Sequence, residues 1–245
     1  MSDARDVRAR ILEALSLAEH PLSGSELGRR LMLSRTAIWK HVRALRREGF
    51  GIEAVPGRGY RLSDDVLTEA AIRAHLGVPR RIGRSIRVLA ETGSTNTDVL
   101  AAATAGEDEG LALFARRQTA GRGRLGRRWH TLPKALAFSV LLRPPMHPAE
   151  ASRLALLAAV AVHEALAAWA PGLGIKWPND LLAGGRKLAG ILTEMRAEPE
   201  RVQAVAIGIG INLAPPPDGW PDDLRWPATD LETACGRPLP QAQVA

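Results

Sequence analysis

The chain has 245 residues, 46% of them hydrophobic, which is enough for a small domain beside a medium one and for a sizeable core. Its single cysteine, Cys235, excludes an internal disulfide and a cysteine metal cluster, and the charged start MSDARDVRAR lacks the apolar stretch of a secretion signal, so we expect a cytoplasmic protein. The formal net charge of +7 favours an anionic partner without identifying it.

Positive charge is concentrated in two separate parts of the chain. The segment from Leu111 to Lys134 holds six arginines and one lysine with no acidic residue, whereas the first 65 residues hold twelve basic and nine acidic residues. Because the two segments are far apart, we expect each to serve a different anionic partner.

The first basic segment has the order of a winged helix-turn-helix. Apolar spacing predicts a helix over residues 7–17, a short serine-capped helix over 23–31, a tight turn at 32–33 and a basic helix over 34–49. Residues 50–63 then alternate as two short strands around a Pro-Gly-Arg-Gly tip, which predicts a wing.

We therefore predict that residues 1–63 bind DNA as part of a homodimer that reads two half-sites. A basic helix without a partner is the alternative, which the winged-helix order of the segments disfavours. The predicted DNA-contacting residues are Ser34, Arg35, Thr36, Trp39, Lys40, Arg43 and Arg58.

The rest of the chain predicts a connector followed by a mixed sheet with helices packed on it. Residues 64–83 predict a connecting helix capped by Thr68 and a linker. Strands are predicted over residues 86–90, 111–115, 136–142, 174–177 and 202–211, with a hairpin over 181–194 and helices over 93–105 and 148–170. Thr95 and Asp98 have the spacing of a capping box. The Ala-rich run 154–170 contains His163 and Glu164, so a buried helix is favoured over a membrane span.

The second basic segment contains the pattern G-x-G-x-x-G through Gly121, Gly123 and Gly126. A dinucleotide-binding turn needs a helix that begins at the last glycine, but RRWHTLPK has no apolar helical stripe and contains Pro133. Aromatic residues are also too sparse here for a nucleic-acid strip. The segment instead predicts a loop whose backbone amides and guanidinium groups surround a small anionic ligand.

Five ordered motifs give the chain a resemblance to a known family. They are GSTN at 93–96, QTAGRGRLGRRW at 118–129, KWPND at 176–180, RKLAGIL at 186–192 and GIGIN at 208–212. This order is similar to that of biotin protein ligases, and with a winged helix in front the chain resembles the bifunctional biotin ligases that also repress the biotin operon.

The resemblance implies a two-step reaction. Biotin and ATP form biotinyl-5′-adenylate and pyrophosphate, and the biotinyl group then passes to a lysine of a carboxylase carrier domain. The substrates are biotin and ATP, and Mg²⁺ assists. It also implies that the adenylate acts as corepressor by promoting dimerisation and operator binding. A lipoate or other acyl-adenylate ligase is the alternative, disfavoured because RKLAGIL with GRGRLGRRW is the biotin form.

The resemblance assigns residues by their place in the motifs. Lys187 and Arg124 are the expected catalytic residues, Lys187 being one of only four lysines beside 29 arginines, where a compact ammonium is needed. The expected biotin site comprises Ser94, Thr95, Asn96, Gln118, Gly121, Arg122, Gly123, Arg124, Trp129, Lys187 and Gly190. The expected ATP site comprises Arg124, Arg127, Lys176, Asn179, Asp180, Lys187 and Asn212. Asp180 is the candidate Mg²⁺ ligand, and no structural metal is expected.

The chain departs from the family after Leu213. Family members continue through helices into an SH3-like barrel, whereas this sequence stops at Ala245. The expected fold is therefore α+β, with a winged helix-turn-helix followed by a mixed α/β catalytic domain of the biotin/lipoate ligase type over residues 84–245 that lacks the barrel. The departure leaves a second function open, a regulator that senses biotin or its adenylate without turnover.

Overall fold

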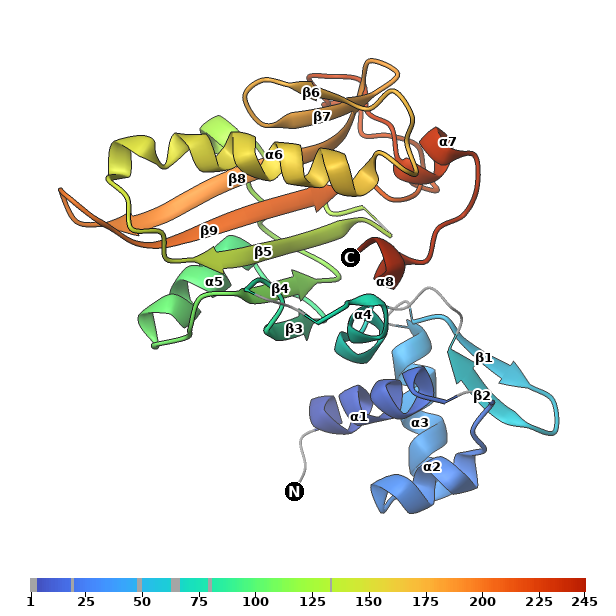
Figure 1. Ribbon diagram of the computed structural model, residues 1–245. Coiled ribbons are helices and arrows are strands. Elements are labelled where there is room, and N and C mark those ends of the chain that lie inside the picture. The colour runs from blue at the N-terminus through green and yellow to red at the C-terminus, as the bar shows by residue number, and fades with distance from the viewer. Residues whose placement is uncertain (1–3, 19, 48–49, 63–66, 79–80, 133) are drawn as a thin grey trace. The chain divides into compact units, whose positions relative to one another are not determined.

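The computed structural model describes residues 4–18, 20–47, 50–62, 67–78, 81–132 and 134–245 (Figure 1). The chain forms two compact units, one of residues 1–77 together with 240–245 and one of residues 78–239. The helix expected in a connector and the last six residues thus belong to the first compact unit. The functional boundaries at 1–63, 64–83 and 84–245 remain predictions.

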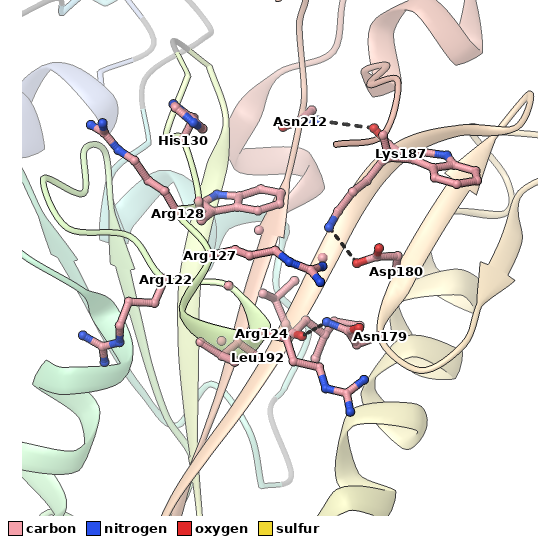
Figure 2. A pocket seen from close by; sticks show the side chains of 18 of the residues that line it. Arg122, Arg124, Arg127, Arg128, His130, Asn179, Asp180, Lys187, Leu192 and Asn212 are labelled. Carbon is pink, nitrogen blue, oxygen red and sulfur yellow. Dashed lines mark hydrogen bonds and ion pairs between the residues drawn. The ribbon is translucent and has the colours of Figure 1, made fainter. Parts of the chain in front are cut away.

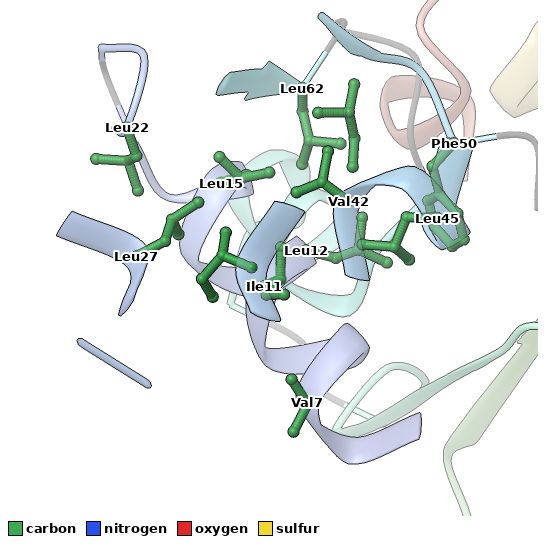
Figure 3. Close-up of a cluster of buried hydrophobic side chains, with 12 residues drawn as sticks. Val7, Ile11, Leu12, Leu15, Leu22, Leu27, Val42, Leu45, Phe50 and Leu62 are labelled. Carbon is green, nitrogen blue, oxygen red and sulfur yellow. The ribbon is translucent and has the colours of Figure 1, made fainter. Parts of the chain in front are cut away.

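The first unit is a winged helix. Its elements are α1 (Ala4–Ser16), α2 (Gly24–Leu31), α3 (Arg35–Arg47), the antiparallel pair β1 (Ile52–Val55) and β2 (Gly59–Leu62), α4 (Glu69–His75) and α8 (Gln241–Val244). Figure 3 shows its core, made of Val7, Ile11, Leu12, Leu15, Leu22, Leu27, Ile38, Val42, Leu45, Phe50, Ile52 and Leu62. Because these apolar side chains come from α1, α2, α3 and both strands, one core holds these three helices and the wing together.

Three predicted caps are confirmed at the starts of helices. Ser23 accepts a hydrogen bond from Glu26 N at 3.1 Å, Ser34 from Ala37 N at 3.1 Å and Thr68 from Ala71 N at 3.0 Å. The tight turn is present as Met32, which ends α2 with a φ of 56°. The predicted end of α3 at residue 49 and the start of the connecting helix at residues 64–66 lie outside the described residues.

The second unit is a seven-stranded sheet with helices on its faces. Its elements are β3 (Ser85–Leu89), α5 (Thr95–Thr104), β4 (Leu111–Ala115), the 3₁₀ turn η1 (Arg124–Gly126), β5 (Leu136–Leu142), the 3₁₀ turn η2 (Pro148–Glu150), α6 (Ser152–Leu166), β6 (Gly174–Lys176), β7 (Asp180–Ala183), β8 (Arg186–Ala197), β9 (Val202–Ile211) and α7 (Leu231–Cys235). The strand order is β3-β4-β5-β9-β8-β7-β6, with β3 and β4 parallel and all other neighbours antiparallel. The predicted mixed sheet is therefore confirmed.

Helices α5 and α6 cover opposite faces of this sheet (Figure 1). Val99 and Ala103 of α5 pack in one cluster with Ala206 of β9. Side chains alternate along a strand, so Ile207 faces the other side, where α6 contacts β8 and β9. The apolar helix α6 is thus a sheet-covering helix, and in the part of the chain that the structure describes no helix is long and apolar enough to cross a membrane.

The capping box expected at the start of α5 is wrong. Ser94 is the N-cap and makes no side-chain cap hydrogen bond, and Asp98 Oδ2 accepts instead from Thr92 Oγ1 at 2.6 Å. The Thr95 hydroxyl lies in a buried polar network with Gln118 and Ser139. Tertiary hydrogen bonds have therefore replaced the local cap, and the start of α5 is held by β5 and the loop after β4.

Candidate functional site

The second unit contains a cavity of about 640 Å³ on the α5 side of β8 and β9 (Figure 2). Its walls come from the start of α5, the Arg-rich loop at 118–132, the turn between β6 and β7, strands β8 and β9, and residues 220–228. Among the residues predicted for biotin and ATP, the cavity is lined by Ser94, Thr95, Asn96, Gln118, Arg122, Gly123, Arg124, Arg127, Trp129, Lys176, Asn179, Asp180, Lys187, Gly190 and Asn212. Gly121 lies behind this lining, where its carbonyl accepts from Trp129 N at 2.9 Å.

One wall of the cavity is a buried hydrogen-bond network centred on Thr95. Gln118 Oε1 accepts from Thr95 N at 2.9 Å and lies 3.1 Å from Thr95 Oγ1. Ser139 Oγ, fully buried on β5, lies 2.6 Å from both Thr95 Oγ1 and Asn96 Oδ1. An amide oxygen only accepts, so the single Ser139 proton goes to Asn96 and Thr95 donates to Ser139 or Gln118. The Gln118 oxygen is thereby committed, and among the described residues none accepts from Gln118 Nε2.

Asn96 is committed on both sides of its amide. Its Nδ2 donates to Leu192 O at 3.2 Å and to Glu194 Oε2 at 2.8 Å, while its Oδ1 accepts from Ser139. The residue is only 3% exposed. Asn96 therefore fixes the start of α5 against the sheet, with one lone pair of Oδ1 left for a ligand.

The floor of the cavity is a strip of sheet without side chains. Gly190 on β8 lies opposite Gly210 on β9, and the Trp129 indole covers both. A Cβ at Gly210 would lie 2.4 Å from the Trp129 ring, and a Cβ at Gly208 would lie 2.5 Å from Asn96 Oδ1. Only glycine at these places allows the close approach. Trp129 Nε1 is buried and has no hydrogen-bond partner among the described residues, so it can donate to a ligand.

A lysine and a carboxylate meet in the cavity lining, at the end toward which Arg124 and Arg127 extend. Lys187 Nζ lies 2.7 Å from Asp180 Oδ1, with the two side chains 27% and 19% exposed. Lys187 is held through its backbone, because its N–H donates to Pro227 O at 2.7 Å and its carbonyl accepts from Thr229 N at 2.9 Å. Its ammonium lies 5.6 Å from the Trp129 ring centroid. The pair thus sits between the glycine floor and the turn after β6.

Two asparagines, Asn179 and Asn212, hold the backbone segments next to the Lys187–Asp180 pair. Asn179 Nδ2 donates to Ile191 O at 2.7 Å, which joins the turn after β6 to β8. Asn212 Nδ2 donates to Thr229 O at 3.1 Å and lies 3.5 Å from Lys187 O. Part of each side chain is therefore used inside the protein, and the Asn179 and Asn212 oxygens remain as acceptors.

The Arg-rich loop is folded back on itself over the cavity. Gly123 N donates to Arg127 O, a bridge joins Arg122 to Arg128, and Leu125 has a φ of 61° inside η1. This closed hairpin is not followed by a helix, which agrees with the exclusion of a dinucleotide-binding turn. In Figure 2 the side chains of Arg124 and Arg127 extend toward Asn179 and Lys187, whereas those of Arg122 and Arg128 extend the other way.

The segment after β9 supplies a wall that sequence reasoning missed. The Lys176 ammonium lies over the Trp226 ring, with Nζ 3.5 Å from the ring centroid. Trp226 Nε1 donates to Gly185 O at 3.0 Å. Arg225 and Asp223 also line the cavity, and Asp223 Oδ2 lies 3.6 Å from His130 Nε2 of the Arg-rich loop. The sequence signal was the Trp-Pro pair at 226–227, which by itself predicts only a turn.

The charge and polarity of the cavity define the ligands it can take. Arg124, Arg127 and Lys187 concentrate positive charge at one end, which suits phosphate or carboxylate groups. The other end has hydroxyl and amide groups and the bare floor under Trp129, which suit a flat, neutral, polar ring. No group of three His, Cys, Asp or Glu side chains could hold a metal within the described ranges.

The first unit carries a separate basic surface, on α3 and the wing, formed by the first basic segment of the sequence. Arg35, Thr36, Trp39, Lys40 and Arg43 are exposed along α3, opposite the buried Ile38 and Val42. Ser34 at the start of α3 and Arg58 at the wing tip are exposed too. The Arg43 guanidinium lies 5.4 Å from the Trp39 ring centroid. The residues predicted for DNA therefore share one helix and the wing tip, all open to a partner.

Comparison with known sequences matches both units. Residues 88–212 match the biotin/lipoate A/B protein ligase family, and residues 7–61 match an HTH domain family. The chain is 42% identical to the bifunctional ligase/repressor BirA of Bacillus spizizenii over 228 residues, covering 91% of this chain and 70% of that protein. It is 40% identical to BirA of Bacillus subtilis over 244 residues, covering 97% of this chain and 74% of that protein.

Solved structures show the same relationship. A biotin protein ligase from Aquifex aeolicus in complex with biotin and ATP aligns with a TM-score of 0.54 at 32% identity, covering 66% of this chain and 65% of that chain. This chain therefore spans about two thirds to three quarters of the length of these relatives. Both matched regions, in this order, show that the chain belongs to the biotin protein ligase family, in its bifunctional ligase/repressor group.

Proposed function

We propose that this chain joins biotin to ATP in the cavity of the second unit, transfers the biotinyl group to a lysine of a carboxylase carrier domain, and represses transcription through the first unit. In the first step a biotin carboxylate oxygen attacks the α-phosphorus of ATP and the bond to pyrophosphate breaks. In the second, the carrier amine attacks the acyl carbon and AMP leaves. The observation that carries the proposal is Lys187, held 2.7 Å from Asp180 among Arg124 and Arg127.

The cations offset the repulsion between the two reacting anions. In the proposed complex the Lys187 ammonium moves from Asp180 to the biotin carboxylate and the α-phosphate, where it neutralises the charge that builds up as they approach. Arg124 and Arg127 bind the phosphate chain with bidentate hydrogen bonds. Lys176 contacts the nucleotide beside the Trp226 indole, which offers a flat face to the adenine ring.

Asp180 also fits a nucleotide-bound Mg²⁺. Mg²⁺ in such sites takes one or two carboxylates together with phosphate oxygens and water. Asp180 Oδ1 is buried in the cavity, and its one described contact is the Lys187 ammonium, so it becomes available when that ammonium turns to the substrates. Asp180 and the phosphates would hold the ion, which supplies further positive charge at the reacting phosphate.

The polar end of the cavity fits the biotin ring system. Ser94 Oγ and Gln118 Nε2, which have no hydrogen-bond partner among the residues that the structure describes, are the groups we assign to the ureido ring. Thr95 and Asn96, whose side chains are committed to Ser139 and Glu194, act mainly by holding that wall in place. Backbone groups of Arg122, Gly123 and Gly190, which line the cavity, complete the site, whereas Gly121 supports it by accepting a hydrogen bond from Trp129 N.

In the proposed function, the first unit binds operator DNA. Exposed Arg35, Thr36, Trp39, Lys40 and Arg43 place hydrogen-bond donors and one indole on the helix that enters the major groove in this type of domain. A dimer doubles the contacts, and a ligand that favours the dimer must favour operator binding to the same degree by linkage. A regulator that senses biotin or its adenylate without turnover would bind the ligand and operator DNA but would not biotinylate the carrier.

The Lys187→Ala variant tests the catalytic assignment. With labelled biotin, MgATP and a carboxylase carrier domain, we expect carrier labelling to slow by roughly 10²- to 10³-fold, because one preorganised cation is lost from the developing charge. Lys134→Ala is the matched control, because Lys134 is a half-exposed lysine outside the cavity lining and should leave labelling unchanged. Equal rates for Lys187→Ala and the unmodified chain would show that Lys187 is not the central cation. Labelling absent from the unmodified chain, together with biotin binding, would identify a sensor.

The Gly210→Ala variant tests the floor of the cavity. Its Cβ would lie 2.4 Å from the Trp129 ring, so the indole must move and we expect the biotin dissociation constant in calorimetry to rise at least tenfold. Gly174→Ala, whose Cβ meets nothing within 4 Å, is the control and should bind as the unmodified chain does. Unchanged affinity in Gly210→Ala would place the biotin ring away from this floor.

The Lys40→Ala variant tests the DNA-binding surface. Duplexes selected from a random library by the unmodified chain with biotin and MgATP provide the probe. We expect weaker binding and a salt slope, log K against log salt concentration, reduced by about 1, as for one lost phosphate contact. Arg153→Ala, an exposed arginine on α6, should change neither quantity. If both variants behaved alike, the selected DNA would be bound elsewhere than on α3.

A further inference from the structure

Glu194 lies on β8, outside the sequence motifs of the site, and joins three segments of the second unit. Its Oε2 accepts from Asn96 Nδ2 at 2.8 Å and from Arg122 Nη2 at 3.0 Å, and its Oε1 accepts from Arg122 Nε at 3.2 Å. One carboxylate therefore ties the start of α5 and the Arg-rich loop to the same point of the sheet.

Every hydrogen-bonding proton of the Asn96 amide has a partner, and Glu194 is the only described side chain that accepts one. Both Nδ2 protons are used, one by Leu192 O and one by Glu194, and Oδ1 accepts from Ser139. Turning the amide over would set Oδ1 against two acceptors, the Glu194 carboxylate and Leu192 O. Glu194 and Leu192 O together thus fix the orientation of Asn96, and Asn96 fixes the polar wall of the cavity.

The Arg122 side chain is the only one of the four loop arginines with a hydrogen bond to another described side chain. It forms a two-pronged pair with Glu194, and its Nη2 also donates to Thr97 Oγ1 at 3.0 Å. In Figure 2 it extends away from Lys187, opposite to Arg124 and Arg127. Arg122 therefore anchors the loop, while its neighbours Arg124 and Arg127 extend over the cavity.

We propose that Glu194 is a positioning residue that fixes the Arg-rich loop relative to the polar wall of the cavity. By binding both Arg122 and Asn96, Glu194 holds the loop in the position in which Gly123 and Arg124 can contact a ligand bound beside Ser94 and Gln118. Loss of the carboxylate loosens the loop and the wall at once, and so weakens the hold on the ligand without removing any group that touches reacting atoms. The effect on ligation rests on the proposed function, whereas the effect on the loop does not.

Limited trypsin digestion of Glu194→Gln measures the anchoring directly, because the loop itself holds four arginine cleavage sites. We expect cleavage after Arg124, Arg127 or Arg128 of the ligand-free protein, monitored by intact mass, to speed up about fivefold, the amount expected for a half-exposed ion pair. These three sites are present in every variant compared. Glu164→Gln on the exposed face of α6 is the matched control and should be cut at the rate of the unmodified chain. Arg122→Gln removes the same pair from the loop side, and the double variant should be cut no faster than the faster single variant.

Steady-state kinetics separates this role from general damage. In Glu194→Gln we expect the KM for biotin to rise about fivefold with little change in kcat, because the reacting groups are untouched. Loop cleavage and KM both equal to those of the unmodified chain, or additive cleavage rates in the double variant, would overturn the proposal. If the unmodified chain forms no adenylate, the proposed function fails, and the cleavage rates still decide whether Glu194 anchors the loop.

Discussion

Two anions, a carboxylate and a nucleotide triphosphate, have to approach each other in the proposed reaction, and offsetting their repulsion is the constraint on which the rest of the site depends. The cavity meets it with Lys187, Arg124 and Arg127 at one end. Without a ligand, the Asp180 carboxylate, 2.7 Å from Lys187, partly offsets this positive charge. Placing cations this close together requires a rigid support, because they repel one another as well. The support comes from backbone hydrogen bonds that hold Lys187 between Pro227 and Thr229.

Rigidity at the neutral end of the cavity has a different source. A buried network through Thr95, Asn96 and Ser139 uses nearly every donor and acceptor, and Gly208 gives it the space to lie flat on the sheet. The Trp129 indole covers the next pair of glycines along the same strands. The sheet supplies Lys187 at the charged end and the glycines at the neutral end, and the Arg-rich loop adds Arg124 and Arg127 to the first and Trp129 to the second. In such an arrangement a ligand that fills both ends strengthens contacts on the loop from two sides, which favours its closed form.

The sequence predicted most of the fold and 15 of the 34 residues that line the cavity, for different reasons. The winged helix followed from caps at Ser23 and Ser34 and from apolar spacing, which are local signals and are confirmed. The motif residues could be placed together only through the family resemblance, since neither spacing nor composition brings residues 94, 124 and 187 to one cavity. The capping box at Thr95 failed because a tertiary network outweighs a local one. Ser139, Glu194 and Trp226 could not be foreseen, because a serine in an apolar strand, a carboxylate within a strand and a tryptophan before a proline have no distinctive local pattern.

The central claim is that one cavity holds biotin and ATP together and forms biotinyl-5′-adenylate. It is tested most directly by incubating the purified chain with biotin and MgATP, removing free ligand, denaturing the protein and quantifying the released adenylate by mass spectrometry. The account predicts close to one equivalent of biotinyl-5′-adenylate per active cavity, and none when biotin or ATP is left out. Recovery of unreacted biotin and ATP from a protein that binds both would contradict it.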